Sequence, residues 1–223
     1  MLDTTFPRIH GDAGNTSSYP YRAEIAVVSG AGAAAIVRPG HPRRDLLPAF
    51  KQAAKDLQAA GAVGLISTCG FLIHFQDEIA QAVDVPVMVS ALSLFDTVRI
   101  ATGGRPVGIL TASATSLLDG GLQAAGIDGR AVHVAGLEDC AAFCDPILLG
   151  RDQPSLDVAK IEASVVARAK ALLVRHTQIG AFLLECGNLP PYAPAIRAAT
   201  GKPVFSILDA ARMLWEASEC QLL

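Results

Sequence analysis

The feature that most constrains the fold is an internal repeat centred on two cysteines. When the sequence is shifted so that Cys69 falls on Cys186, each copy reads as an apolar run, Cys-Gly, an amphipathic segment, a proline and a second apolar run. The matched pairs are Gly70 with Gly187, Leu72 with Leu189, Ile79 with Ile196, Ala82 with Ala199, Pro86 with Pro203 and Val87 with Val204. Two unrelated α/β units often share apolar periodicity, but a Cys-Gly pair and a proline at the same spacing are a more specific match. We therefore interpret the chain as two similar halves.

Short apolar runs alternate with longer amphipathic segments along the chain. The candidate strands are Glu24–Ser29, Val63–Thr68, Val87–Ser90, Val107–Leu110, Ala131–Val134, Ala181–Glu185 and Val204–Leu208. The candidate helices are Asp45–Ala60, His74–Val83, Thr115–Ala125, Leu156–His176, Tyr192–Ala199 and Asp209–Ser218. Runs that are apolar throughout are typical of strands buried on both faces of a parallel sheet. The pattern predicts an α/β fold of two pseudo-symmetric parallel-sheet halves, with a site in the cleft between them.

The length and composition agree with two compact units. Of the 223 residues, 51% are hydrophobic and 17% are charged, so the chain can bury a sizeable core. We assign residues 1–91 and 204–223 to the first half, which contains Cys69, and residues 92–203 to the second half, which contains Cys186.

Charge and hydropathy exclude several classes of function. The net charge is -3 and no basic run occurs, so we expect no nucleic-acid partner. No run of about 18 apolar residues occurs, so we expect no membrane span. The segment Leu2–Thr5 lacks the basic start and apolar centre of a signal peptide, so we expect a cytoplasmic protein.

The five cysteines point to free thiols rather than to a disulfide framework or a metal site. Their number is odd and no CxxC pair occurs. Cys140, Cys144 and Cys220 are interpreted as structural, because no histidine or second cysteine pair accompanies them. We therefore expect no metal and no cofactor.

The repeat places Cys69 and Cys186 where ligands bind in parallel α/β sheets. Each follows an apolar strand and precedes a helix, and ligands bind beyond the carboxyl ends of such strands. A helix N-terminus favours the thiolate, so the sequence predicts lowered thiol pKa values. Gly70 and Gly187 would let a ligand approach the backbone, and their amides could bind a carboxylate or oxyanion.

Two opposed thiols suit proton exchange at a carbon next to a carboxylate or carbonyl. One thiolate takes a proton from one face of the carbon, and the other thiol returns a proton to the opposite face. The product is a racemate or epimer. Amide donors directed at the developing enolate would supply part of the stabilisation. Each cysteine taken alone is more often a small buried apolar residue, and the matched pair is what favours a catalytic function.

Several motifs make the chain resemble the aspartate/glutamate/hydantoin racemase superfamily. The motifs are Ser67-Thr68-Cys69-Gly70-Phe71, Leu184-Glu185-Cys186-Gly187-Asn188-Leu189-Pro190-Pro191-Tyr192, Leu2-Asp3-Thr4-Thr5-Phe6-Pro7-Arg8 and Gly11-Asp12-Ala13-Gly14-Asn15. The resemblance spans almost the whole chain. It implies a two-domain α/β fold, catalysis without a cofactor by Cys69 and Cys186, a small carboxylate or hydantoin substrate, and a possible homodimer.

The resemblance also suggests residues that bind the substrate. The loop Thr111-Ala112-Ser113-Ala114-Thr115 aligns with a carboxylate-binding loop, which makes Thr111, Ser113 and Thr115 candidates, although helix capping alone explains one of these hydroxyls. Asn15 is a further candidate beside the simpler reading of its glycine-rich segment as a turn.

The chain departs from glutamate racemases directly after each cysteine. Those enzymes carry Asn-Thr after the first cysteine and Thr-His after the second, whereas Gly70-Phe71 and Gly187-Asn188 stand here. We expect these four residues to contact the substrate, to make the site more apolar and to disfavour free glutamate or aspartate. Of the family's first strand only Met1–Thr5 remains.

Other functions on the same scaffold stay open. They are an arylmalonate-decarboxylase-like enzyme with one cysteine, a maleate-isomerase-like enzyme, and a non-catalytic protein that binds small acids. His74 could tune the Cys69 thiol, although a histidine in such a place more often packs or faces water. Strand alternation predicts that the side chain of Glu185 points to the face opposite Cys186, so we do not assign it as a base.

Overall fold

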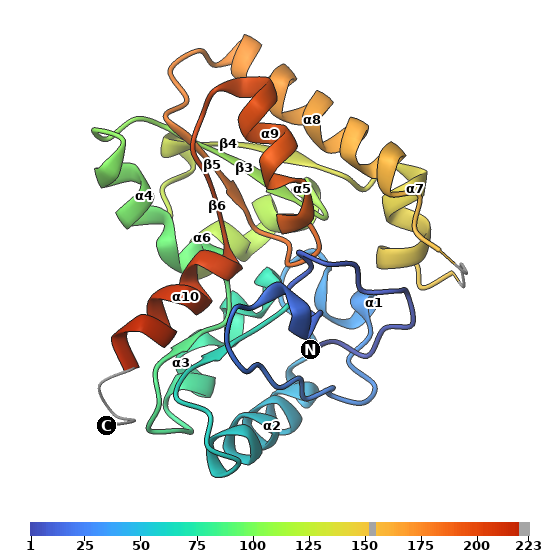
Figure 1. Ribbon diagram of the computed structural model, residues 1–223, viewed down its shortest axis with the longest axis vertical. Helices are drawn as coiled ribbons and strands as arrows, with labels where there is room; N and C mark the ends of the chain where they lie inside the picture. The colour runs from blue at the N-terminus through green and yellow to red at the C-terminus, as the bar shows by residue number, and fades with distance from the viewer. Residues whose placement is uncertain (152–154, 219–223) are drawn as a thin grey trace.

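The protein is described by a computed structural model that covers residues 1–151 and 155–218, and it has the predicted α/β architecture with parallel strands (Figure 1). The strands are β1 (Leu65–Ile66), β2 (Val87–Met88), β3 (Val107–Thr111), β4 (Val132–Gly136), β5 (Ala181–Leu184) and β6 (Val204–Ser206). The helices are α1 (Ala33–Ile36), α2 (Leu47–Ala59), α3 (Gln76–Ala80), α4 (Phe95–Ala101), α5 (Ala114–Ser116), α6 (Leu122–Ala124), α7 (Ala141–Phe143), α8 (Val158–Arg175), α9 (Ala193–Thr200) and α10 (Ile207–Ser218). Cys220 lies outside the described residues. Within the described ranges, no helix combines the length and apolarity that crossing a bilayer requires.

The larger sheet has the parallel strand order β4-β3-β5-β6. Every residue of β3 and β5 is buried, as the uniformly apolar sequence of these strands predicts. Helices α8 and α9 pack together on one face of the sheet, and α4 and α10 lie on the other (Figure 1). The amphipathic α8 begins at Asp157, whose side chain accepts a hydrogen bond from the Lys160 amide.

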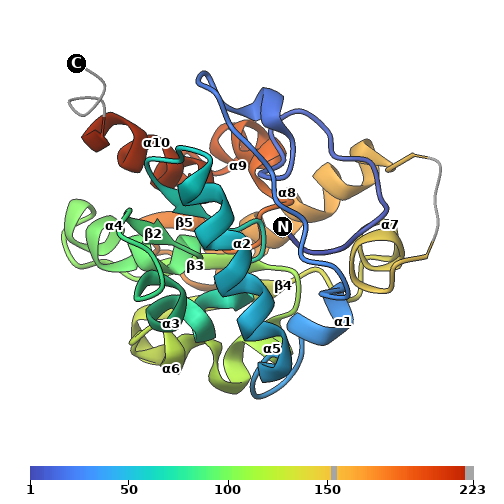
Figure 2. The same ribbon diagram turned by 90° about the horizontal axis from the view of Figure 1, so that it is seen from below.

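The smaller sheet consists of β1 and β2, which pair in parallel. Figures 1 and 2 place α2 and α3 with it, at the end of the molecule opposite α8 and α9. The predicted strand Glu24–Ser29 is wrong: the segment makes an isolated bridge between Val28 and Leu2. It pairs with the short N-terminal segment, where the Val28 amide donates to the Met1 carbonyl, and the pairing does not extend into a regular ladder.

The C-terminal segment divides between the two sheets. The sequence assigned residues 204–223 to the first half, but β6 hydrogen-bonds to β5 and therefore lies in the sheet of the second half. Helix α10 then contacts both β6 and β1, so the chain returns to the first half along this helix.

Two predicted helices are broken by local structure. The segment predicted as His74–Val83 begins with a 3-10 helix, Gly70–Phe75, before α3. The segment predicted as Thr115–Ala125 is interrupted at Asp119 and Gly120, and Gly120 has φ of 104°. The interruption frees the Asp119 carbonyl to accept a hydrogen bond from the Gly40 amide at 3.1 Å. A contact distant in sequence thus replaces a turn of helix, which helical periodicity alone does not reveal.

The Gly120 backbone gives a test of this break. We expect Gly120→Ala to lower the free energy of unfolding by about 1–3 kcal/mol, because a side chain is strained at this positive φ, and urea denaturation measures the change. Gly129→Ala is the control, because Gly129 has ordinary φ and nothing lies within 4 Å of the added Cβ. Equal midpoints for the two variants would contradict the described break.

Candidate active site

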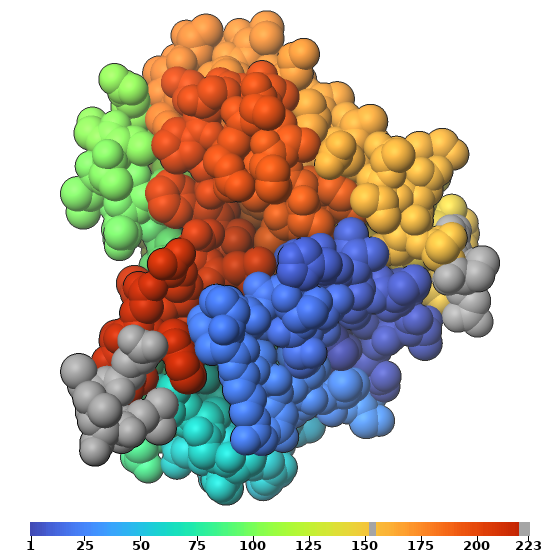
Figure 3. All heavy atoms as spheres, viewed as in Figure 1, coloured from blue at the N-terminus to red at the C-terminus, as the bar shows by residue number. Residues whose placement is uncertain are grey.

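Cys69 and Cys186 line one small cavity between the two halves. Its volume is about 20 Å³, enough for a single water molecule. The cavity is lined by Leu2, Thr4, Phe6 and Arg8 of the N-terminal segment, by Ala33 and Val37, by Thr68–Phe71, and by Ala112, Ile147, Leu148, Glu185, Cys186 and Asn188. The N-terminal segment, blue in Figure 3, lies across the junction of the halves. The two thiols therefore line a narrow, largely buried site between the halves.

A larger hollow lies elsewhere. It has a volume of about 290 Å³ and runs along β1, where Tyr21 stacks on Trp215. Neither cysteine lines it. We assign the chemistry to the smaller cavity, because that is where the titratable side chains converge.

The two thiols have matching backbone surroundings. Cys69 follows β1 and precedes the 3-10 helix Gly70–Phe75, and the nearby Phe71 amide favours its thiolate. Cys186 follows β5, and the nearby Asn188 amide favours its thiolate in the same way. In each half the amide two residues after the cysteine faces the thiol, which extends the sequence repeat to a repeated sulfur environment.

Burial raises the pKa of both thiols, against the prediction from the helix N-termini. The side chains of Cys69 and Cys186 are buried, and burial raises the pKa of Cys69 to about 12 and that of Cys186 well above its ordinary value. The charge of Glu185 adds to both increases, and the backbone amides oppose them. The predicted lowering is wrong because loss of hydration outweighs one donated hydrogen bond. Near Cys69, the Arg8 cation also favours the thiolate.

At Gly70 and Gly187 the loops that carry the two cysteines pack closely against each other. A Cβ on Gly187 would lie 2.4 Å from the carbonyl oxygen of Thr68, and a Cβ on Gly70 would lie 2.4 Å from the carbonyl oxygen of Glu185. Each glycine thus packs on the residue that precedes the opposite cysteine. This packing accounts for the repeated Cys-Gly sequence without a ligand, and substrate contact by these two residues stays a prediction.

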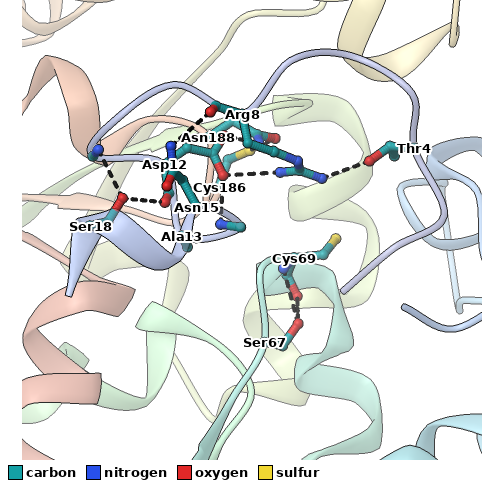
Figure 4. A network of polar contacts seen from close by, with 12 residues as sticks. Thr4, Arg8, Asp12, Ala13, Asn15, Ser18, Ser67, Cys69, Cys186 and Asn188 are labelled. Carbon is teal, nitrogen blue, oxygen red and sulfur yellow. Dashed lines mark hydrogen bonds and ion pairs between the residues drawn. The ribbon is translucent and has the colours of Figure 1, made fainter. Parts of the chain in front are cut away.

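Arg8 connects the N-terminal segment to Cys186 (Figure 4). Its guanidinium donates to Asp12 Oδ1 at 3.1 Å and to Thr4 Oγ1 at 2.7 Å. Asp12 Oδ2 accepts from the Asn188 side chain at 2.7 Å, and Asn188 Oδ1 accepts from the Cys186 thiol at 3.4 Å. Arg8 Nε is buried and has no hydrogen-bond partner among the described residues. A carboxylate that entered the cavity would meet a cation with an unused donor.

Glu185 faces the same cavity as the thiols, contrary to the expectation from strand alternation. Strand β5 ends at Leu184, so alternation does not extend to Glu185 and Cys186. Glu185 Oε2 accepts from Thr111 Oγ1 at 2.7 Å, whereas Oε1 is buried without a partner among residues 1–151 and 155–218. Burial raises the pKa of this carboxyl to about 7.

The predicted carboxylate-binding loop is satisfied by the protein itself. The amides of Ala114 and Thr115 donate to Glu138 Oε1 at 2.9 and 3.3 Å. Ser113 caps α5 by accepting from the Ser116 amide. Of the three predicted hydroxyls, Thr111 approaches the cavity through its bond to Glu185, and Ser113 and Thr115 do not line it.

Two other residues considered from the sequence lie away from the cavity. Asn15 accepts from the Ser17 amide and donates to the Arg8 carbonyl, so it orders the N-terminal loop. His74 pairs with His41 at 3.2 Å between their Nδ1 atoms. Phe71 and Asn188, in contrast, line the cavity, and their contact with a substrate stays a prediction. In the described part of the chain, no group of three or more His, Cys, Asp or Glu could hold a metal ion.

Sequence reasoning missed Arg8 and Glu185. Both stood within quoted motifs. For Glu185 the available signal was a charged residue at the end of an apolar run, whereas the mixed segment around Arg8 offered no such signal. For Glu185 that signal was overruled by a strand assigned one residue too long.

Comparison with known proteins identifies the family. Residues 15–215 match the sequence profile of the Asp/Glu/Hydantoin racemase family. A dimethylsulfoniopropionate lyase of Durusdinium sp. clade D is 31% identical over 94% of this chain and 70% of its own length. Dimethylsulfoniopropionate lyase 5 of Emiliania huxleyi is 31% identical over 97% of this chain but only 44% of its own length.

Solved structures share the fold at low sequence identity. Allantoin racemase from Klebsiella pneumoniae has a TM-score of 0.56 with 18% identity, covering 82% of this chain and 78% of that one. A sulfate-bound variant of arylmalonate decarboxylase has a TM-score of 0.54 with 16% identity, covering 85% and 81%. At these identities the likeness concerns the fold alone.

The crossing of the two cysteine loops can be tested at Gly187. Gly187→Ala places a Cβ against the Thr68 backbone, so we expect a loss of about 1–3 kcal/mol in the free energy of unfolding, measured by urea denaturation. Faster alkylation of Cys69 and Cys186 is also expected, because the halves must separate, and Gly129→Ala again serves as control. Unchanged stability and unchanged alkylation would contradict the described packing.

Proposed function

Because the chain belongs to the Asp/Glu/hydantoin racemase family, we propose that it is a cofactor-independent enzyme that removes a proton from the carbon next to the carboxylate of a small acid. The proposed reaction is elimination of dimethyl sulfide from dimethylsulfoniopropionate. The observation that carries the proposal is the meeting of two buried thiols and one arginine at a single cavity.

The proposed reaction balances with the groups present. A thiolate takes the α-proton, the C–H electron pair forms the double bond of acrylate, and the bond from Cβ to sulfur breaks so that neutral dimethyl sulfide leaves with its electron pair. Arg8 binds the carboxylate and stabilises the negative charge that develops on it. We assign Cys69 as the base, because the Arg8 cation favours its thiolate, whereas Asp12 raises the pKa of Cys186.

The walls of the cavity suit a sulfonium better than an ammonium group. Leu2, Phe6, Phe71 and Ile147 are apolar and buried, and they present the surface that S-methyl groups would contact. The identity with several dimethylsulfoniopropionate lyases over most of this chain supports the same choice. Because the cavity holds only one water, substrate entry requires the segment Thr4–Arg8 to move, and its return would exclude water during proton transfer.

Racemisation is the second candidate. Its support is the repeated sulfur environment, in which both thiols face a backbone amide two residues ahead. Two opposed acid–base groups are what exchange of a proton between two faces of a carbon requires.

The two reactions differ in what they need from each thiol. We expect Cys69→Ala to lower dimethyl sulfide release from dimethylsulfoniopropionate by about 10²–10⁴-fold, the usual contribution of a general base, and Cys186→Ala to have a smaller effect. Gas chromatography of the headspace measures the release. Cys140→Ala, outside the cavity, is the matched control.

Two observations together would favour the racemase over the lyase. The unaltered protein would release no dimethyl sulfide, and an unreacted amino acid or hydantoin would take up deuterium from heavy water at its α-carbon.

Arg8 provides a separate test of carboxylate binding. Arg8→Lys keeps a positive charge beside the buried Asp12 but loses the planar pair of donors, so we expect kcat/KM to fall by about 10–100-fold, mainly through KM. Arg130→Lys, in an exposed ion pair, should leave kinetics unchanged. An unaltered KM in Arg8→Lys would remove Arg8 from the site.

A further inference from the structure

Glu185 is a buried carboxyl that the proposed reaction does not use. Its side chain is 1% exposed and lines the cavity together with both thiols. A Cβ on Gly70 would lie 2.3 Å from Glu185 Oε1, so this oxygen lies directly against the Cys69 loop although Glu185 precedes Cys186 in the chain. The carboxyl therefore reaches from the second half to the first.

The hydrogen bonds of Glu185 fit a neutral acid better than a carboxylate. Oε2 accepts one hydrogen bond, from Thr111, and Oε1 has no partner in the described part of the chain. An ionised carboxylate without hydrogen-bond donors or a paired cation is costly to bury. A proton on Oε1 removes that cost, which agrees with a pKa raised by burial to about 7.

We propose that Glu185 is a positioning residue that controls the ionisation of both thiols: while Oε1 carries its proton one thiol can ionise, and when Glu185 ionises both thiols are held in the protonated form. Of the three acids Glu185, Cys69 and Cys186, one then carries a negative charge at a time. The other charged groups that face them are Arg8 and Asp12.

The electrostatics act on both half-sites at once. Glu185 is a cause of the raised pKa at Cys69 and also at Cys186, which lie on different halves. Because interactions between charges are mutual, a thiolate at either position in turn favours the protonated form of Glu185. Arg8 opposes the effect at Cys69, whereas Asp12 adds to it at Cys186. One carboxyl thus couples the two thiols.

The consequence for turnover rests on the proposed function, whereas the control of the thiols does not. Below pH 7 Glu185 is neutral, and as the pH rises through about 7 it ionises and opposes thiolate formation. The rate of elimination should therefore rise less steeply with pH above 7 than thiol ionisation alone would give, and Glu185→Gln should remove this restraint.

The test is a thiol titration of the full chain and needs no substrate. Alkylation of each cysteine by iodoacetamide is followed by mass spectrometry of its peptide between pH 6 and 10, in the unaltered protein and in Glu185→Gln. The amide keeps the shape and the hydrogen bond from Thr111 but cannot ionise. Cys140 and Cys144 in the same samples are the internal control, because neither lines the cavity.

Above pH 7 we expect Glu185→Gln to raise the alkylation rates of both Cys69 and Cys186 by about tenfold at a given pH, because a fall of about one unit in a thiol pKa raises the thiolate fraction about tenfold. Thr111→Val, which removes the hydrogen bond that favours the ionised form of Glu185, should shift both in the same direction by less. It serves as the second variant if Glu185→Gln does not fold by circular dichroism.

A shift at Cys186 alone, or at neither thiol, would overturn the inference. Equal shifts at Cys140 and Cys144 would do the same, because they would reveal a general loosening of the fold. If both cavity thiols shift but no elimination occurs in any variant, the control by Glu185 stands and the proposed reaction fails.

Discussion

The site depends on the close crossing of two loops. Gly70 packs on the carbonyl of Glu185 and Gly187 packs on the carbonyl of Thr68, at distances that leave no room for a side chain. This contact brings together thiols that follow strands of two different sheets, and it fixes them without a covalent link or a metal ligand. It also closes the space between them to about 20 Å³, so that every charge in the cavity interacts with the others through little water.

Closure explains why the electrostatics of the site differ from those of an isolated helix N-terminus. One amide faces each sulfur, but burial raises both thiol pKa values. A thiolate base in such a cavity is costly to form and correspondingly reactive toward a carbon acid, provided that a cation or a neutral acid compensates its charge. Arg8 supplies the cation. It stands on the N-terminal segment that covers the cavity, so that cover and charge are brought by the same piece of chain (Figure 3).

The sequence predicted the features that arise from local patterns. The repeat identified Cys69 and Cys186, and uniformly apolar runs located β3 and β5 closely. It failed where a tertiary contact decides, because Asp119 leaves its helix to accept from Gly40. In the loop predicted to bind a substrate carboxylate the Ala114 amide donates to Glu138, and substrate binding there stays a prediction. Glu185 was misplaced for a smaller reason, because strand alternation was extended one residue beyond Leu184, where the hydrogen-bonded strand ends.

The two copies of the repeat match at Cys-Gly and differ in the side chains around it. When the sequence is shifted so that Cys69 falls on Cys186, Thr68 corresponds to Glu185, and Phe71 corresponds to Asn188. Cys69 therefore has an aromatic neighbour, whereas Cys186 has an amide that is tied to Asp12. A reaction that treats the two faces of a carbon alike would benefit from equal surroundings at the two thiols. Unequal surroundings suit a substrate with unlike ends, whose carboxylate would lie near Arg8 and whose leaving group would lie against the apolar wall. The unequal surroundings of the two thiols therefore favour elimination over racemisation.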